Sequence, residues 1–165
     1  MKKHLVLSLF LLLSTQLFAQ RLVKKEFIIT EWHCDYNDYY SEKDTITLLR
    51  LLNYTTDTGL PKVHVIAYYN KAKDMVSIDF QKKSKAFLGT LTFNWCGNLE
   101  GMEEWTWDFN ETLQVLSLYA DNKLNASFRV IDRKVVKEEW TYEVNKGKLT
   151  LFDTEFNILK LYRIQ

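Results

Sequence analysis

The sequence predicts an all-β protein in which antiparallel strands run up and down in a meander and close into a barrel of about 8–10 strands. The first observation is a strict alternation of apolar and polar residues, the pattern of a strand with one buried face. The second is that short polar turns recur at a spacing of roughly 8–12 residues. The third is the composition, with ten Phe, nine Tyr and five Trp beside five Gly and one Pro. Aromatic residues fit a pleated, half-buried surface and so favour strands.

The first 19 residues have the layout of a secretory signal peptide. Lys2 and Lys3 precede an apolar run over residues 5–13, and Ala19 provides a small residue at the expected cleavage site. The run is too short to cross a bilayer, which needs about 20 apolar residues. We therefore expect residues 1–19 to be removed and the protein to be exported, either to a bacterial periplasm or as a secreted protein. No membrane insertion is expected after cleavage.

Residues 20–165 are expected to form one domain, because a chain of this length can bury a single core. Removing the signal peptide takes away two lysines and no acids, so the formal net charge changes from +1 to about −1. A near-neutral chain lacks the basic face that nucleic-acid binding requires. We therefore expect no nucleic-acid partner.

Along the chain, the first expected strand covers residues 25–34, KEFIITEWHC. Residues 42–53 fit two interpretations. Apolar residues at helical spacing favour one short helix, whereas the Thr-Ile-Thr sequence at residues 45–47 favours a strand. A loop with Gly59 and Pro61 as breakers follows. Three strands are then predicted, over residues 63–69, 75–81 and 87–95.

The four-residue sequence EEWT occurs twice, at residues 103–106 and 138–141. In the first copy Trp105 and Trp107 alternate with polar residues, and in the second Trp140 and Tyr142 do so. Each copy is followed by a polar turn and further alternating segments, so each is expected to begin a strand–turn–strand–turn–strand unit. The predicted strands are residues 103–109, 113–120, 124–131, 138–144, 149–152 and 158–164.

One segment of the chain resembles the core of small bacterial lipocalin-like domains. It covers residues 91–131, LTFNWCGNLEGMEEWTWDFNETLQVLSLYADNKLNASFRVI. Those domains carry an LTF-N-x-x-G strand end, a G-x-W-x-[WY]-D strand, an L-x-L strand and a strand that ends in Val-Ile, and the resemblance extends from Phe87 to Ile164. The chain departs from the family pattern because Trp32 lacks the usual preceding Gly, and because Met102 and Glu103 stand where a Gly before the central Trp is common. The resemblance implies an up-and-down barrel, with a cavity in many relatives and no common reaction.

The aromatic face is the candidate ligand site of such a barrel. A small barrel either fills its interior with side chains or leaves room for one ligand. Large rings favour an apolar or flat ligand, so we expect a small hydrophobic ligand and no cofactor. The residues expected to line the cavity are Phe93, Trp95, Trp105, Trp107, Trp140 and Tyr142. The alternative is a solid core, with a protein or glycan bound by an outer face or by the Tyr36–Tyr40 loop.

The two cysteines, Cys34 and Cys96, allow one disulfide, and disulfides are common in exported proteins. The alternative is a pair of buried free thiols that behave as small apolar side chains. A metal site made of both cysteines is not expected, because no CxxC spacing is present.

The sequence gives little indication of catalysis, and we expect neither an enzyme nor a metal site. The known nucleophile, zinc and phosphate-loop motifs are missing. His33 lies two residues from Glu31 on one strand face, which is more typical of a structural histidine than of half a metal site. A hydrolase using paired carboxylates is a weaker alternative, because the candidates lie opposite the aromatic face. These candidates are Glu104, Asp108, Glu139 and Glu143.

Overall fold

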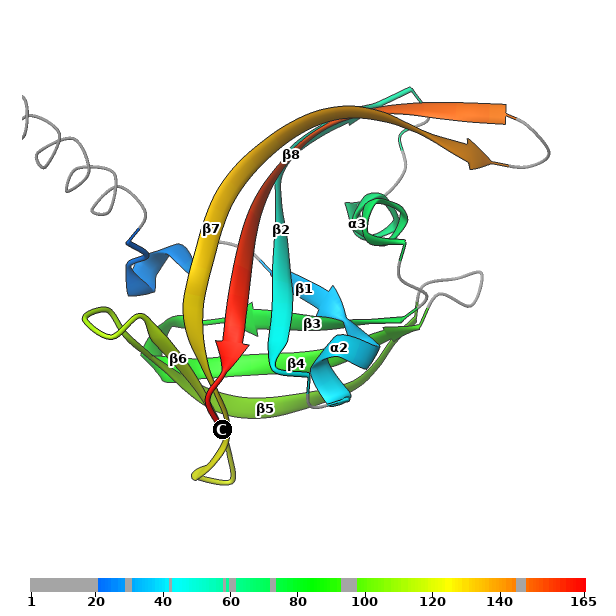
Figure 1. Cartoon of the computed structure of the whole chain (residues 1–165). Helices are drawn as coiled ribbons and strands as arrows, with labels where there is room; N and C mark the ends of the chain where they lie inside the picture. The colour runs from blue at the N-terminus through cyan, green and yellow to red at the C-terminus, as the bar shows by residue number, and fades with distance from the viewer. Residues whose placement is uncertain are drawn as a thin grey trace, which may run out of the picture.

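A computed structural model describes residues 21–28, 31–41, 43–57, 59, 62–71, 74–92, 98–144 and 148–165. The described chain is mainly β-strand with two short α-helices, which confirms the predicted all-β class (Figure 1). In chain order the elements are η1 (Lys24–Glu26), β1 (Trp32–Asp35), α2 (Tyr36–Tyr40), β2 (Thr45–Thr56), α3 (Lys62–Asn70), β3 (Asp74–Phe80), η2 (Lys82–Ser84), β4 (Lys85–Thr92), β5 (Asn98–Asn110), β6 (Val115–Ala120), β7 (Lys123–Val144) and β8 (Lys148–Arg163). The predicted signal peptide, residues 1–19, lies outside the described residues.

The eight described strands form one antiparallel sheet in which every strand pairs with two neighbours. The order β1-β2-β8-β7-β6-β5-β4-β3 returns from β3 to β1, so the ring of pairings closes on itself. From β3 to β8 each strand pairs with the next one in the chain, as a meander requires. The N-terminal hairpin departs from the expected up-and-down order, because β1 pairs with β3 and β2 pairs with β8. The connection from β2 to β3 contains α3 and so does not need a tight hairpin turn.

For residues 42–53 the sequence left both a helix and a strand open, and residues 45–53 belong to β2. Residues 63–69, expected as a strand, belong instead to α3. Because β2 buries side chains on both faces, its apolar residues form a nearly continuous run without a clear strand period. In α3, Val65 and Ile66 are buried against other elements, and this packing outweighs the strand preference of β-branched residues.

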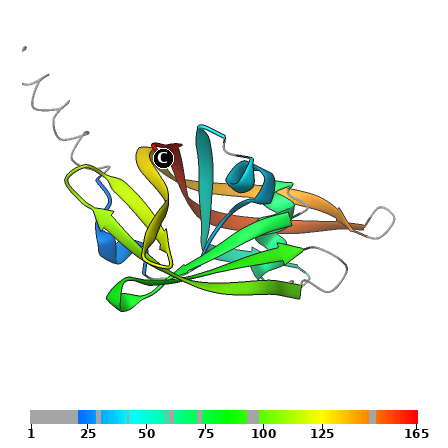
Figure 2. The ribbon, with the colours of Figure 1, turned by 90° about the horizontal axis from the view of Figure 1, so that it is seen from below.

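Strands β7 and β8 are longer than any strand predicted. The expected strands 124–131 and 138–144 are one strand, and so are 149–152 and 158–164. The predicted turn over residues 153–157 is strand, since Thr154 and Phe156 are buried there and pair with β7. Each EEWT copy therefore lies inside a strand and does not begin one. The hairpin of residues 131–144 and 148–157, called the β7–β8 arm, extends beyond the ring (Figure 1, Figure 2).

Smaller differences occur at other strand ends. Among the described residues of the expected strand 25–34, those at 32–34 belong to β1, and Lys24–Glu26 form a 3₁₀ turn. Residues 98–102, expected as part of a turn, belong to β5, which begins at Asn98. The turn at Asp121 and Asn122 is confirmed, with φ angles of 49° and 60°. Positive φ at both central positions is typical of a type I′ hairpin, which Asp and Asn tolerate.

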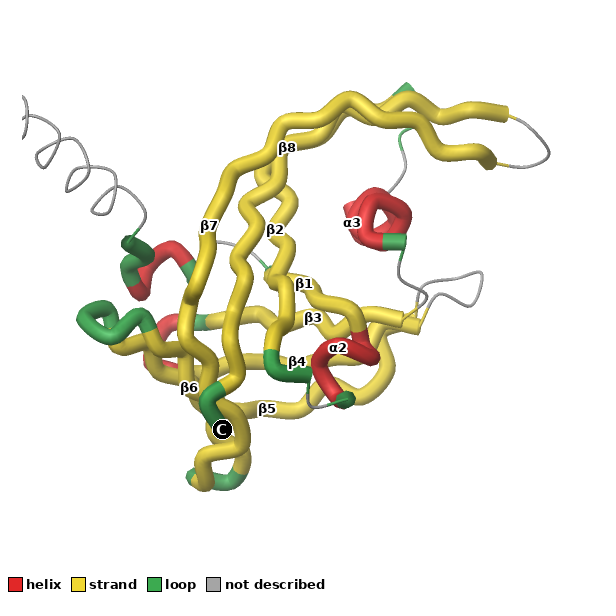
Figure 3. Tube along the Cα trace, in the orientation of Figure 1, coloured by secondary structure: helices red, strands yellow, loops and turns green. Residues whose placement is uncertain are grey.

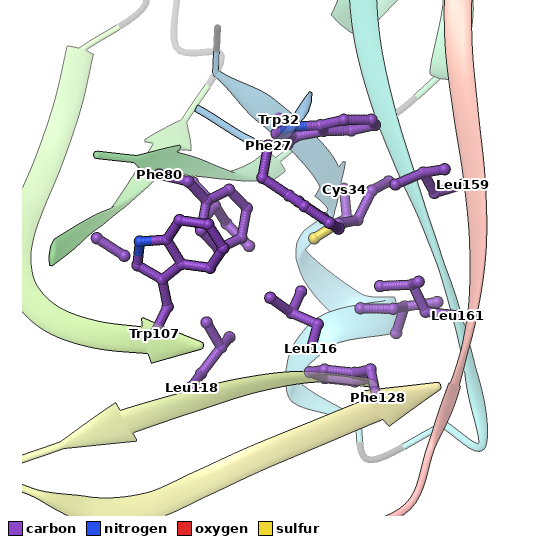
Figure 4. Close-up of a cluster of buried hydrophobic side chains, with 14 of the residues drawn as sticks. Phe27, Trp32, Cys34, Phe80, Trp107, Leu116, Leu118, Phe128, Leu159 and Leu161 are labelled. Atoms are coloured by element: carbon purple, nitrogen blue, oxygen red, sulfur yellow. The ribbon is translucent and has the colours of Figure 1, made fainter. Parts of the chain in front are cut away.

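The described apolar side chains form two separate cores. The first core fills the ring and includes Phe27, Trp107 and Leu159 (Figure 4). The second core lies between α3 and the β7–β8 arm, and its buried members are Leu51, Val65, Ile66, Ala67, Met75, Phe152 and Phe156. Successive strand residues point to opposite faces, so Leu159 and Phe156 of β8 lie on different faces of the sheet. The two cores therefore occupy opposite faces of the same strands.

Cys34 is a free thiol with 0% exposure in the first core (Figure 4). The predicted Cys34–Cys96 disulfide is therefore not seen, and Cys96 lies outside the described residues. Burial, with the nearby charge of Asp35, raises the pKa of the Cys34 thiol, so the group stays protonated. Cys34 behaves as the small apolar side chain of the alternative interpretation, because its strand position points into the core.

Candidate functional site

Trp107, expected to line a ligand cavity, is packed inside the first core. Its Nε1 donates a hydrogen bond to the backbone oxygen of Gln81 at 3.0 Å. Its ring meets Phe80 edge to face, with centroids 4.9 Å apart, and lies 5.9 Å from the ring of Phe27. Phe27 also contacts Phe109 at a centroid distance of 4.8 Å. Side chains fill the interior of the ring around Trp107. This part of the ring therefore has the solid core that the sequence left open as an alternative to a ligand cavity.

Trp140 belongs to the second core. Its ring stacks on Phe152 with centroids 4.3 Å apart and an interplanar angle of 14°. Its Nε1 donates to Oγ1 of Thr154 at 3.0 Å, so the polar atom of the indole is satisfied in place. Tyr69 of α3 approaches the same ring at a centroid distance of 5.7 Å. Trp140 therefore attaches the arm to α3 and lies on the other face of the sheet from Trp107.

The predicted ligand residues do not form one lining. Trp105 packs at the margin of the first core, and its Nε1 donates to Oε2 of Glu103 at 2.9 Å. Tyr142, near the tip of the arm, is 37% exposed. Phe93 and Trp95 lie outside the described residues. The four described aromatics are thus divided between two cores and the surface.

A pocket of about 530 Å³ opens elsewhere, between α2 and strands β3, β4 and β5. Its floor includes Val76 and Leu88, which are buried members of the first core. The pocket therefore lies at the mouth of the ring, directly above the packed interior. The lining residues are Tyr36, Tyr40, Asp74, Val76, Leu88, Gly89, Thr90, Gly101 and Glu103.

Helix α2 places two tyrosines over this pocket. Oδ1 of Asp35 accepts hydrogen bonds from the backbone N–H groups of Asn37 and Asp38, at 2.8 and 3.3 Å, and so caps the helix. Tyr36 and Tyr40 are four residues apart, so they share one helix face, and their ring centroids lie 4.5 Å apart. This segment was predicted as a loop that could bind a protein or glycan, and the i, i+4 spacing of its two end tyrosines, which indicates one helix face, was not used.

The helix is held against the barrel from the other side. The Tyr39 ring is 6% exposed and packs in the first core, with Phe128 at a centroid distance of 6.5 Å. Nη2 of Arg163, at the end of β8, donates to the backbone oxygen of Tyr39 at 2.7 Å. Tyr36 and Tyr40 are therefore presented by an anchored element.

The pocket combines flat rings with negative charge. Asp74 and Glu103 line it, and the lining residues that the structure describes include no lysine, arginine or histidine. Partial burial, followed by the proximity of Tyr36 and Glu103, raises the pKa of Tyr40. Its phenol therefore stays neutral and keeps a hydrogen to donate. The pocket can contact a flat apolar surface and accept hydrogen bonds from a ligand.

Gly101 shapes the strand that borders the pocket. It has a φ of +63°, a value that residues with a side chain rarely adopt. The β4–β5 register shifts between Leu88 and Thr90, directly opposite this glycine. A bulge of this kind bends the strand and redirects its side chains, here beside Glu103.

The carboxylates considered for hydrolysis do not form a site. All four of Glu104, Asp108, Glu139 and Glu143 are exposed. Glu104 pairs with Lys85 and Asp108 pairs with Lys24, each at 2.6 Å. Carboxylates on the outer surface with lysine partners are unlike a hydrolytic pair enclosed around a substrate. The outward placement of these carboxylates therefore gives the hydrolase interpretation no support.

His33 is a buried strand residue, 4% exposed. Its Nε2 lies 3.7 Å from Oε2 of Glu31. Burial lowers the pKa of His33 to about 4, so the imidazole is neutral near pH 7. Within the described ranges, no three His, Cys, Asp or Glu side chains come together in a way that could hold a metal. The described part of the chain also has no helix long and apolar enough to span a membrane.

Comparisons with protein-family models, with curated proteins and with solved structures found no match to this chain.

Proposed function

We propose that the protein is an exported, lipocalin-like binding protein that holds a small ligand at the mouth of its barrel, between α2 and strands β3–β5. The observation that carries the proposal is the pocket of about 530 Å³ over which Tyr36 and Tyr40 are anchored. Ligand sites usually have volumes of about 300–1,000 Å³ and combine apolar walls with a few polar groups. This pocket has both features.

The lining chemistry favours a ligand with a flat or apolar face and hydrogen-bond donors. The tyrosine rings provide a stacking surface at low conformational cost. Asp74, Glu103 and Thr90 supply acceptors at the rim. The sequence suggested a small hydrophobic ligand, apolar or flat, inside the barrel, but the packed rings around Trp107 support a site at the mouth. Hydroxyl or amino groups on an aromatic or sugar ring would match this lining.

Export is proposed from the signal-peptide layout of residues 1–19, in which Lys2 and Lys3 precede an apolar run and Ala19 provides a small residue at the expected cleavage site. The lipocalin-like assignment is supported by the antiparallel pairing of β3 to β8 and by the motifs within residues 91–131. The placement of β1 beside β3 differs from a simple up-and-down barrel. The proposal therefore concerns a barrel of this kind with a rearranged N-terminal hairpin.

The test is native mass spectrometry of the exported protein, followed by titration with a panel of small aromatic amines and phenyl glycosides. We expect a bound mass that is lost on denaturation, or saturable binding of a panel member. Tyr40→Ala should weaken binding by about tenfold or more, because stacked aromatic contacts supply much of such affinity. The matched control is Tyr162→Ala, a tyrosine of similar exposure on β8 outside the pocket. Binding that survives both Tyr36→Ala and Tyr40→Ala would overturn the assignment.

A second candidate is a surface module that binds a protein or a longer glycan. It is favoured by the filled interior and by the exposure of Tyr40, which is 53%. Tyrosines beside acids are typical of such binding surfaces. Glycan-array binding that depends on Tyr40, without binding of single-ring ligands, would distinguish it from the first proposal.

A further inference from the structure

One long edge of the β7–β8 arm has no partner strand among the described residues. Strand β6 pairs with β7 over residues 123–129, and the Val130 N–H donates to the backbone oxygen of Gln114 at 2.9 Å. From residue 131 to residue 144, β7 pairs with β8 alone in the described part of the chain (Figure 3). An open strand edge presents alternating N–H and C=O groups that another strand can pair with.

This edge carries an ordered set of charges. Asp132, Arg133 and Lys134 stand before Val135 and Val136, and Lys137, Glu138 and Glu139 follow them. Charged side chains on an edge usually prevent indiscriminate pairing. Arg133 and Lys134 precede Val136 at the same distances at which Glu139 and Glu138 follow it. An antiparallel copy of the same edge would therefore bring these opposite charges together. The charges select one pairing and oppose its neighbours.

We propose that the open edge of β7 pairs antiparallel with the same edge of a second copy of this chain, with Val136 opposite Val136. In this register Lys134 lies opposite Glu138 of the second copy, and Arg133 lies opposite Glu139. The two-fold axis repeats each pair, which gives four ion pairs, while Lys137 lies opposite Val135 and Asp132 lies opposite Trp140 without a like charge. The result is one sheet that continues through both arms.

Neighbouring registers fail on charge or on symmetry. The two-fold axis is perpendicular to the sheet, so two residues that lie directly opposite each other point to the same face. The pairing can therefore shift only in steps of two residues. One such slip places Lys137 opposite Lys137 of the second copy. The opposite slip places Arg133 opposite Lys137 and Asp132 opposite Glu138. Like charges directly opposite destabilise a strand pair, so the Val136 register is selected.

The Lys134–Glu138 contact is the principal ion pair of the proposed interface. Arg133 already pairs with Glu26 of its own chain, with both side chains about 20% exposed. Lys134 and Glu138 are exposed at the edge, and the Tyr69 hydroxyl bonds to Glu138 from the inner side. A carboxylate can accept more than one hydrogen bond, so Glu138 can contact a second copy without leaving Tyr69.

The first test is sedimentation equilibrium of the full chain, expressed with its own signal and purified after export. We expect a concentration-dependent dimer. Lys134→Glu and Glu138→Lys should each raise the dimer dissociation constant by about tenfold or more, because each substitution creates two like-charge contacts. The double charge exchange should restore dimerisation. The matched control is Lys123→Glu, an exposed lysine at the other end of β7, which should have no effect.

A cysteine cross-link tests the register itself in a Cys96→Ser background. Val136→Cys should give a disulfide-linked dimer, because directly opposite Cα atoms lie about 4.5–5.5 Å apart, within disulfide reach. Val135→Cys should not, because its symmetry mate would be displaced by two residues, to roughly 8 Å. A monomer throughout the micromolar range would overturn the proposal. So would a dimer indifferent to both charge reversals, or equal cross-linking of the two cysteine variants.

Discussion

The two EEWT copies have the same sequence and different structural roles. In the first copy Trp105 lies at the margin of the first core, and the next aromatic on that face, Trp107, is fully buried. In the second copy the order is reversed. Trp140 packs in the second core, and the next aromatic, Tyr142, is 37% exposed. The local pattern therefore specifies an aromatic strand face, while the opposing element decides which ring is buried.

The opposing elements explain the difference. Strand β5 has the whole interior of the ring against its aromatic face, including Phe27 and Phe80. The β7–β8 arm has one short helix against its inner face, and α3 contacts it through Tyr69. The first core should therefore determine global stability, and the second should determine whether the arm and α3 stay folded together.

The largest expected effect comes from Trp107→Ala. Removing a fully buried Trp should lower the free energy of unfolding by about 3–5 kcal/mol through lost burial and the cavity left behind. Urea denaturation followed by circular dichroism measures this change. A loss no greater than that of Trp140→Ala would remove the distinction between the cores.

The second prediction concerns pH and His33, which shares a sheet face with Leu49 and Ser77 by register. Burial lowers its pKa to about 4, whereas the unfolded chain titrates near 6.5. The unfolded state alone takes up the proton between these values, so stability falls as pH drops from about 6.5 towards 4, by on the order of 3 kcal/mol.

Denaturation curves across that pH range provide the measurement, with His33→Asn as the comparison. Glu31 acts in the opposite sense, because burial followed by the charge of Asp79 raises its pKa. The difference between wild type and His33→Asn isolates the histidine. Parallel pH profiles for the two proteins would mean that His33 is accessible to protons in the folded state.

Trp140→Ala should have a smaller effect than Trp107→Ala. Its ring is partly exposed at the margin of the second core, so a loss of about 2 kcal/mol is expected. In the same denaturation experiment the unfolding transition of the ring should be unchanged. The β7–β8 arm should unfold at a lower urea concentration than in the wild type. A loss as large as that of Trp107→Ala would mean that the two cores unfold as one.

The smallest effect concerns Cys34, whose folded-state thiol should not react with iodoacetamide. The side chain has 0% exposure and burial raises its pKa, so neither access nor the thiolate is available. Labelling should become complete in denaturant, as judged by intact mass. Rapid labelling of the native Cys96→Ser variant, or an intact mass of the wild type about 2 Da below that of the reduced chain, would contradict a free buried thiol.

The sequence was a good guide where one strand face is buried and the other is solvated. The segments 103–109 and 113–120 show that alternation, and they became parts of β5 and β6. It was a poor guide where both faces are buried, because the apolar run in β2 has no period to read. It failed for α3, whose helix depends on packing under an arm distant in sequence.

The candidate site also has one part that the local sequence predicts and one part that it does not. The i, i+4 spacing of Tyr36 and Tyr40 is local and could have been recognised. Their proximity to Asp74 and Glu103 depends on the placement of β1 beside β3, which is a long-range pairing. The division of Trp107 and Trp140 between two faces depends on the β8 register and could not be read from either copy of EEWT.

The central claim is that one sheet carries two independent cores, and amide hydrogen exchange of the Trp140→Ala variant tests it most directly. We predict faster exchange in α3 and along residues 131–157, with protection in β3 to β6 unchanged, because local unfolding follows local packing. Uniform loss of protection throughout β3 to β8 would show a single cooperative core and contradict the account.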